Sequence, residues 1–372
     1  MRSAARLVLA VWPPLSLIVA VLAVMLLTHG VNPQVNAYLI QALISGILVL
    51  GLYIFVGNSG VVSLGHASFM AVGAYVGGIL SIPLFQRATL LPDLPGWIAG
   101  HELSLWWAAL VAVGVSVVLG YLIAIPLSRL SGLAAAVSTL ALLQITQVVE
   151  LNWTWLTSAG GATPGIPADV TRWDAFAGVV VAILVAFLYQ RSSSGVRLRA
   201  SREDSIAAQA IGVNIARERR LALALSAGIL GLGGAMYAHF VGVVTPTDYF
   251  IQASFLMLAM LVIGGVTSMA GAVVGVAVVS LITDLLLQIE STQGLLSVTV
   301  SLPNGIDTLI IAVILVLILI VRPSGLTGGR EVGVPRRLRN RITGASPGAG
   351  VPPPQEPPPP PAVVPLSNQL DS

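Results

Sequence analysis

Apolar stretches long enough to cross a bilayer recur along the chain as far as Val321. Only 9% of the side chains are charged, whereas soluble domains average about 25%. Backbone in hydrocarbon must satisfy its own hydrogen bonds, and single spans of this length do so as helices. The chain is therefore expected to be an all-α, polytopic membrane protein with about ten transmembrane helices. The predicted spans are Leu7–Thr28, Asn36–Gly57, Ala67–Pro83, Leu105–Leu127, Leu130–Leu151, Ala175–Gln190, Leu221–Val241, two within Ala253–Ile289, and Gly305–Val321.

The longest apolar run, Ala253–Ile289, has 37 residues and is too long for one span. A straight helix of that length would extend about 55 Å, well beyond a hydrocarbon core of about 30 Å. Small residues in the middle of the run, Gly264, Gly265, Ser268 and Gly271, offer a place to turn. We therefore predict two spans joined by a glycine-rich break.

The arginines indicate which loops face the cytoplasm. If both termini are cytoplasmic, 16 of the 18 basic residues, all of them arginine, lie on the inner side of the membrane. Only Arg87 and Arg172 then lie outside, in the loops Leu84–Ser104 and Asn152–Asp174. Basic residues concentrate in cytoplasmic loops, so this orientation is predicted.

The interval Arg191–Arg220 is the longest charged stretch, with seven arginines and three acidic residues. Ser201 and Asp204 are spaced like a capping box, and Glu203 and Asp204 suit the positive end of a helix. An apolar stripe follows, and Gly212 is a suitable helix stop. The stripe consists of Ile206, Ala207, Ala210 and Ile211. The pattern predicts a short amphipathic helix on the cytoplasmic side; the alternative is a solvated loop that only connects two spans.

A glycine-rich stretch, Gly57–Gly78, separates the second span from the third. Irregular backbone at membrane depth is tolerated only where it is buried in protein or lines a watery cavity. The helix after such a break directs N–H groups at the cavity and can hold a carboxylate. Gly73 and Gly77 also permit close helix packing, so the glycines have two alternative roles. The candidate substrate-pathway residues are Gly57, Ser59, Gly60, Ser63, Gly65, His66, Gly264, Gly265 and Ser268.

Few ionisable groups lie near membrane depth. Glu150, Asp284 and Asp307 are functional candidates because such residues are costly there. However, Glu150 and Asp307 fall at predicted span ends, and Asp284 can simply pair with a neighbouring helix. His66 is either a ligand-binding or a structural group, and no second His, Asp or Glu stands at metal-binding spacing.

The chain contains neither cysteine nor lysine. These absences exclude disulfides, thiolate metal sites and a P-loop lysine. Any ATPase must therefore be a separate chain, and no cofactor is expected. The sequence also lacks a Ser-His-Asp arrangement or a carboxylate pair, so it is not expected to be an enzyme.

Several motifs resemble one family of transporters. REDSIAAQAIGVN and the following RRLALALSAGILGLGGAMYAH are similar to permeases of branched-chain amino-acid ABC importers, specifically the LivM-like subunit. SLGHASF followed by GAY, TSAGG followed by GIP, and RPSGL at residues 322–326 resemble the same family. Ala207, Ala208 and Gly212 match the signature that seats in a cleft of the ATPase subunit, although Ile206 stands where that signature has glutamate.

This resemblance implies a permease that moves branched-chain amino acids by alternating access in the bacterial plasma membrane. The implied partners are a second, LivH-like permease, two ATP-binding subunits, an extracytoplasmic substrate-binding protein and the lipid bilayer. The implied ATPase-docking residues are Ser201, Arg202, Glu203, Asp204, Ile206, Ala207, Ala208 and Gly212. The implied contact with the binding protein comprises Thr157, Gly160 and Gly161.

Two other functions stay open. One is an ABC permease for urea or short amides. The other is an ion-coupled secondary transporter, a class that keeps acidic ion sites near the bilayer midplane. Only Asp284 meets that description here, which weakens the second alternative.

The sequence changes character after Leu326 and becomes rich in Pro, Gly and Arg, with eight prolines from Pro352 to Pro361. Such a composition cannot bury a core. We therefore divide the chain into a transmembrane permease domain, residues 1–326, and a disordered cytoplasmic tail, residues 327–372.

Overall fold

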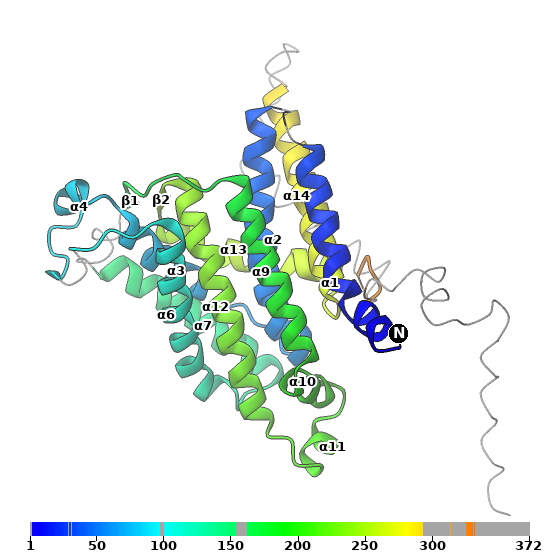
Figure 1. Ribbon diagram of the computed structural model, residues 1–372. Coiled ribbons are helices and arrows are strands. Elements are labelled where there is room, and N and C mark those ends of the chain that lie inside the picture. The colour runs from blue at the N-terminus through cyan, green and yellow to red at the C-terminus, as the bar shows by residue number, and fades with distance from the viewer. Residues whose placement is uncertain are drawn as a thin grey trace, which may run out of the picture. The chain divides into compact units, whose positions relative to one another are not determined.

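The computed structural model describes residues 2–28, 30, 32–96, 100–153, 162–292, 313, 325–329 and 331, and Figure 1 shows its elements. The account below concerns Val11–Gly333, one of the two compact units into which the chain divides. The elements are α1 (Arg2–Leu27), α2 (Pro33–Ser59), α3 (Ala67–Ser81), α4 (Leu84–Leu90), α6 (Leu105–Leu127), α7 (Gly132–Asn152), β1 (Thr163–Pro164), α9 (Arg172–Arg191), α10 (Ser193–Glu203), α11 (Ser205–Ala210), α12 (Ile215–Val241), β2 (Val243–Val244), η2 (Pro246–Tyr249), α13 (Ile251–Gly264) and α14 (Met269–Thr292).

The predicted all-α, polytopic class is confirmed. Six of the described helical segments can cross a membrane by length and composition: α2, α6, α7, α9, α12, and η2 together with α13. The pair α3 and α4, bent by 119°, makes a seventh if it counts as one span, and Val11–Leu27 and Met269–Leu285 are shorter apolar helices. The tenth predicted span, Gly305–Val321, lies outside the described residues except for Val313. The count of ten therefore stays a prediction.

Helices α2 and α12 form the centre of the bundle. The most apolar part of α2 is 78% buried and that of α12 is 83% buried, against 17% for α7. Helix α12 packs against α6, α3 and α2, and α2 also contacts α9 and α14 (Figure 1). A helix that is apolar and buried on all sides belongs to the interior of a bundle, so α2 and α12 are the frame on which the other helices pack.

Glycines let α3 and α12 approach each other backbone to backbone. A Cβ added at Gly73 would lie 2.2 Å from the carbonyl oxygen of Gly231, and one at Gly234 would lie 1.9 Å from that of Met70. Gly77 packs against α12 in the same way. Close packing of small residues drives helix association in lipid. The packing role of Gly73 and Gly77 is thus confirmed.

The predicted break within Ala253–Ile289 is also confirmed. Helix α13 ends at Gly264 and α14 begins at Met269. Gly265 between them has a φ of +126°, which other residues rarely adopt. A Cβ at Gly264 would lie 1.9 Å from the carbonyl oxygen of Gly271, so the two helices fold back on each other with their backbones in close contact.

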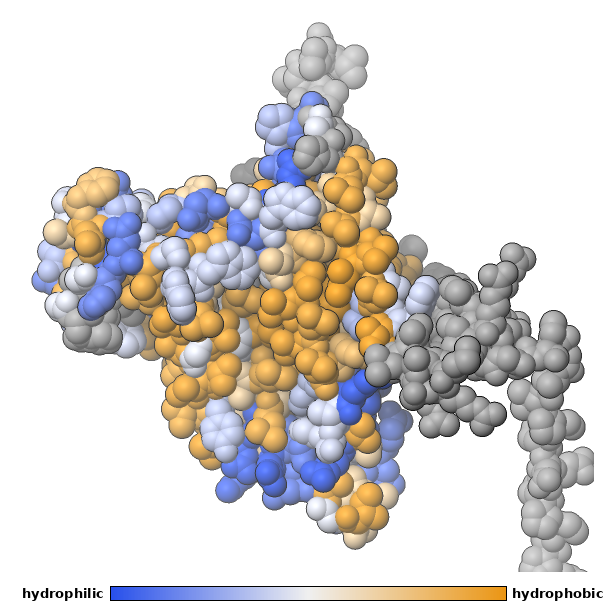
Figure 2. All heavy atoms as spheres, in the orientation of Figure 1, coloured by the Kyte–Doolittle hydropathy of each residue, from blue (hydrophilic) through white to orange (hydrophobic). Residues whose placement is uncertain are grey.

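Charged residues gather at one end of the bundle, which we call the α10 end. Helices α10 and α11 lie there, after the end of α9 and before the start of α12 (Figure 1). Figure 2 shows a hydrophilic surface around them, adjoining a broad apolar belt. Arg219 donates hydrogen bonds to the carbonyl oxygens of Ser128 at 3.4 Å and Leu130 at 2.7 Å, which places the α6–α7 turn at the same end.

The opposite end holds the β1–β2 ribbon and the start of α9. Thr171 and Asp174 form a capping box there, and Trp106 Nε1 donates to Asp174 Oδ1 at 3.0 Å. Arg87 is buried and donates to backbone carbonyl oxygens at the end of α3, while Arg172 is the first residue of α9. The two arginines that were predicted to lie apart from the others are therefore both at this end.

Candidate coupling loop and translocation pathway

The charged loop folds as two short helices instead of the single helix predicted. Helix α10 runs to Glu203, and Asp204 then adopts an extended conformation (φ −147°, ψ 107°) that interrupts the helix. The Asp204 carboxylate accepts hydrogen bonds from the N–H groups of Ile206 at 2.9 Å and Ala207 at 3.0 Å. Asp204 is thus the N-cap of α11.

The predicted capping box between Ser201 and Asp204 is wrong. Ser201 lies within α10, where its Oγ donates to the carbonyl oxygen of Leu198 at 2.7 Å. The backbone of Asp204 is not helical, and its carboxylate accepts hydrogen bonds from the N–H groups of Ile206 and Ala207. Asp204 therefore begins a new helix. Gly212 (φ +87°) ends the helical segment as predicted, and its N–H donates to the carbonyl oxygen of Gln209 at 2.9 Å.

The tip of the loop exposes apolar side chains. Ile206 is 81% exposed and Ile211 is 79% exposed. Ala207 and Ala210 are exposed beside them, and Figures 1 and 2 show apolar surface at α11, next to the hydrophilic end. Single exposed apolar residues are ordinary, but four on one short segment indicate a contact surface. The predicted stripe is therefore present and available to a partner.

Ala208 of the same motif faces the other way. It is 3% exposed, and its carbonyl oxygen accepts a hydrogen bond from the N–H of Val213 at 3.0 Å. A larger side chain here would disturb α11 itself, so the contact surface is better tested at Ile206. The other predicted docking residues divide into exposed ones, Glu203, Asp204 and Gly212, and ones turned inward, Ser201 and Arg202.

A polar cleft of about 620 Å³ lies at the base of α11. Its walls come from the α6–α7 turn, α11 and the start of α12, with Ser128, Arg129, Ser131, Ser205, Gln209, Asn214 and Arg219 among the lining residues. Asn214 caps α12 by accepting a hydrogen bond from the N–H of Arg217 at 3.1 Å. Helix α11 therefore lies beside the ends of three long apolar helices, α6, α7 and α12.

The first glycine break, Gly57–His66, touches α10. Arg202 Nη1 donates to the carbonyl oxygen of Gly57 at 2.7 Å. Gly60 has a φ of +70°, and a Cβ there would lie 2.8 Å from Arg202 Cγ. Position 60 therefore requires glycine for two reasons, the left-handed backbone conformation and the close approach of α10.

The same break packs against α7. A Cβ at Gly65 would lie 2.3 Å from the carbonyl oxygen of Thr139. The Thr139 hydroxyl accepts a hydrogen bond from the N–H of Leu64 at 3.1 Å. Gly65 is thus a packing residue in this conformation.

His66 is enclosed by the protein. It is 2% exposed, its Nδ1 lies 2.7 Å from Ser63 Oγ, and its ring lies 5.5 Å from that of Phe55 and 6.2 Å from that of Phe69. Ser59 is buried as well, and its Oγ accepts a hydrogen bond from the backbone. These surroundings favour the structural alternative for His66.

The second glycine break, Gly264–Ser268, lies against the first. A Cβ at Gly57 would lie 2.8 Å from the carbonyl oxygen of Val266. Ser268 is fully buried, and its Oγ accepts a hydrogen bond from the N–H of Gly271 at 2.8 Å. The structure thus brings together the two segments that were predicted to belong to the substrate pathway.

Sequence reasoning placed Leu326 in the permease domain but assigned Thr327 and Glu331 to the tail. The N–H of Leu326 donates to the carbonyl oxygen of Ile263 at 2.9 Å, and Thr327 Oγ1 donates to that of Gly264 at 2.9 Å. Packed residues therefore continue at least to Glu331, which contacts α14. The RPSGL motif was the one signal that pointed to this region. Residues 332–372 lie outside the described part, so the disordered tail stays a prediction.

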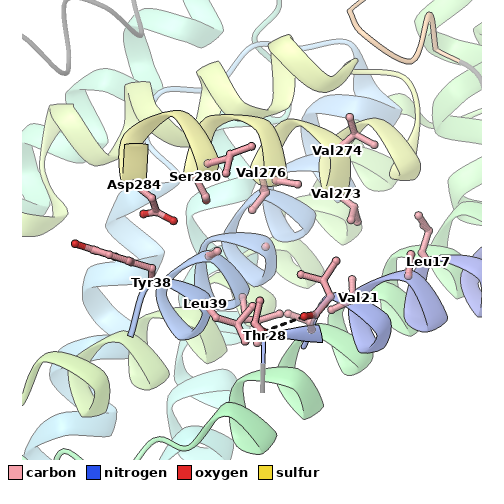
Figure 3. A pocket seen from close by; sticks show the side chains of 18 of the residues that line it. Leu17, Val21, Thr28, Tyr38, Leu39, Val273, Val274, Val276, Ser280 and Asp284 are labelled. Carbon is pink, nitrogen blue, oxygen red and sulfur yellow. Dashed lines mark hydrogen bonds between the residues drawn. The ribbon is translucent and has the colours of Figure 1, made fainter. Parts of the chain in front are cut away.

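Asp284 lines an apolar groove of about 500 Å³ between α1, α2 and α14 (Figure 3). Aliphatic side chains form most of its wall, and Tyr38 and Ser280 are polar neighbours from α2 and α14. The ion pairs found in the described residues are Arg197–Glu218 and Arg202–Glu203, so none of them involves Asp284. Among the described residues that line the groove, Asp284 is the only acidic one, so none of them offers a second acid to share an ion with it.

The remaining candidate functional residues are Glu150, which the structure describes, and four residues that it does not describe. Glu150 is 7% exposed near the end of α7. Thr157, Gly160, Gly161 and Asp307 lie outside the described residues. Within the described ranges, no group of three or more His, Asp or Glu side chains could hold a metal ion.

The sequence matches a known protein family and several known proteins over most of its length. The family "branched-chain amino acid transport system / permease component" matches residues 34–319. LivM of Salmonella typhimurium strain LT2, a high-affinity branched-chain amino acid transport system permease protein, is 27% identical over 316 residues, or 75% of this chain and 67% of LivM. LivM of Escherichia coli K12 is 25% identical over 314 residues, with the same coverage. LivH of the same Salmonella strain is 27% identical over 184 residues, 49% of this chain and 54% of LivH. No solved structure matches.

The family match begins in α2 and includes both glycine breaks and the α10–α11 loop. The chain belongs to the family of branched-chain amino acid transport system permease components.

Proposed function

We propose that this chain is the LivM-like permease subunit of an ABC importer and moves branched-chain amino acids by alternating access. One observation supports this most strongly: the exposed apolar tip at Ile206 and Ile211, mounted beside the ends of three long apolar helices. An apolar tip on a polar end fits a cleft in a soluble subunit. Such a subunit can then move the spans through the loop.

Two separate ATP-binding subunits supply the energy in this proposal. The chain has no lysine and so cannot form a P-loop lysine site of its own. In this proposal the chain is a transport subunit and not an enzyme, and it needs no cofactor besides the ATP that its partners bind.

Two further partners belong to the proposal. LivM and LivH of Salmonella are both named permeases of branched-chain amino acid transport. We propose that a LivH-like permease completes the pathway, and that a substrate-binding protein delivers the ligand at the end opposite α10. Thr157, Gly160 and Gly161 are the proposed contact with that binding protein.

The two glycine breaks are the proposed moving part of the pathway. They touch at Gly57 and Val266, and hinged helix ends absorb backbone changes during alternating access. Their separation would expose the backbone of Gly60, Gly264 and Gly265 and the hydroxyl of Ser268 to the ligand.

The substrate class is tested by uptake in cells that lack the gene. Restoring the chain should restore uptake of labelled leucine, and excess isoleucine or valine should compete while urea and acetamide should not. Competition by urea or acetamide alone would assign the chain to the alternative class of amide permeases.

The proposed orientation places the α10 end and both termini in the cytoplasm of a bacterial cell. The gathering of arginines at the α10 end supports it. Because the chain has no cysteine, single cysteines report cleanly. An impermeant maleimide should label Asp93→Cys in intact cells and Ser205→Cys only after permeabilisation. Labelling of Ser205→Cys from outside would reverse the topology.

A further inference from the structure

Helix α10 has a direct polar contact with the first glycine break. Arg202 donates from Nη1 to the carbonyl oxygen of Gly57 at 2.7 Å, across 145 residues of sequence. Its stem also fills the space beside Gly60. A hydrogen bond from a charged donor is roughly twice as strong as a neutral one. Movement of α10 therefore either displaces the end of α2 or breaks this bond.

The second glycine break is held by residues that follow the last predicted span, which we call the clasp: Leu326, Thr327 and Glu331. Backbone bonds run from Leu326 to Ile263 at 2.9 Å and from Thr327 to Gly264 at 3.1 Å. Glu331 Oε1 accepts a hydrogen bond at 2.9 Å from the N–H of Met269, the first residue of α14. A carboxylate at this place also interacts favourably with the positive end of the helix.

A second route joins α10 to the clasp through the last turn of α9. Arg199 of α10 donates from Nη2 to the carbonyl oxygen of Gln190 at 2.7 Å. The Gln190 side chain donates from Nε2 to Glu331 Oε1 at 3.2 Å. Arg199, Gln190, Glu331 and Met269 thus form a continuous chain of contacts from α10 to α14.

We propose that Arg202 and Glu331 are positioning residues that transmit movement of α10 to the two glycine breaks. The inference rests on the proposed function, because it supposes that ATPase subunits move α10. Neither side chain needs to touch the transported ligand. Arg202 fixes α10 directly to the first break, and Glu331 joins the second break to α10 through Gln190 and Arg199. The contact between Gly57 and Val266 makes the two breaks move together.

The test uses the assembled complex in proteoliposomes with its ATPase subunits and binding protein. Glu331→Ala should keep assembly and basal ATP hydrolysis, lose the stimulation of hydrolysis by loaded binding protein, and reduce uptake by roughly tenfold, the upper part of the range for coupling residues. Arg202→Met, which keeps the aliphatic stem, should reduce uptake to a similar extent. Glu331→Gln retains an acceptor oxygen for Met269 and Gln190 and should restore most of the uptake.

A double-mutant cycle separates transmission from a general loss of stability. If Gln190 acts through Glu331, the variant with Gln190→Ala and Glu331→Ala should transport no worse than Glu331→Ala alone. Asp93→Ala, at the opposite end, is the matched loss of a carboxylate and should behave as wild type.

The outcomes distinguish the inference from the function on which it rests. Wild-type uptake in Glu331→Ala, loss of complex assembly in that variant, or multiplying effects in the double mutant would each overturn the inference and leave the importer intact. Failure of the wild-type complex to transport with ATP would overturn both.

Discussion

Replacing Gly234 by valine is expected to prevent α3 and α12 from packing. A Cβ at this position would lie 1.9 Å from the carbonyl oxygen of Met70 and 3.0 Å from the backbone N of Ala74. Neither atom belongs to a side chain that could rotate away, so the two helices must separate. Overpacking of this kind costs about 3 kcal/mol or more, and in lipid such close contacts are a main source of helix association.

Gly114→Val is the matched control because a Cβ at Gly114, on α6, would meet nothing within 4 Å. We expect Gly234→Val to elute as aggregate in size-exclusion chromatography or to unfold at a clearly lower temperature in detergent. Gly114→Val should stay within about 0.5 kcal/mol of wild type. Equal stability of the two variants would contradict the packing of α3 on α12.

The membrane-capable helices of the described residues could be predicted, because length and apolar composition almost alone determine whether a segment can span a membrane. The break in Ala253–Ile289 could also be placed, because 37 apolar residues exceed the bilayer and the glycines mark the one suitable turn. The spacing of Gly73 and Gly77 indicated helix packing as one of two alternative roles, and the structure confirms the packing. These predictions depend on local sequence and the thickness of the membrane.

The break between α10 and α11 could not be predicted from the sequence. Asp204 suits the first turn of one helix and also the cap of another, and the sequence allows both. In the structure Asp204 caps α11, because its extended backbone lets the carboxylate accept hydrogen bonds from two N–H groups. The inward turn of Ala208 could not be read from the loop alone either, because it depends on how α11 closes against Val213.

Contacts between distant segments were also beyond the sequence. Gly57 and Val266 each lie in a recognisable glycine break, but nothing in either stretch shows that the two breaks meet. Glu331 falls in a region whose composition predicts disorder, yet its carboxylate binds the first N–H of α14. Glycines in a sequence show where the backbone can bend, but they do not show which other segment packs against it.

Replacing Ile206 by aspartate is expected to uncouple the permease from its energy source. The side chain is 81% exposed, so the folded chain should tolerate the change. In a complex, the same position would bring a charge into an apolar cleft without a partner, which is costly. Changes at interface hot spots cost about 2 kcal/mol or more, roughly a 30-fold loss of affinity. Ser193→Asp, an exposed position at the start of α10, is the control for added charge in the same loop.

The direct measurement is ATP-driven leucine uptake in proteoliposomes that contain the complete complex, together with co-purification of the ATPase subunits. The account predicts that wild type and Ser193→Asp retain both, whereas Ile206→Asp stays monodisperse but loses the ATPase subunits and the uptake. Retention of the ATPase subunits and of uptake by Ile206→Asp, or leucine uptake by the wild-type chain on an ion gradient without ATP, would contradict it.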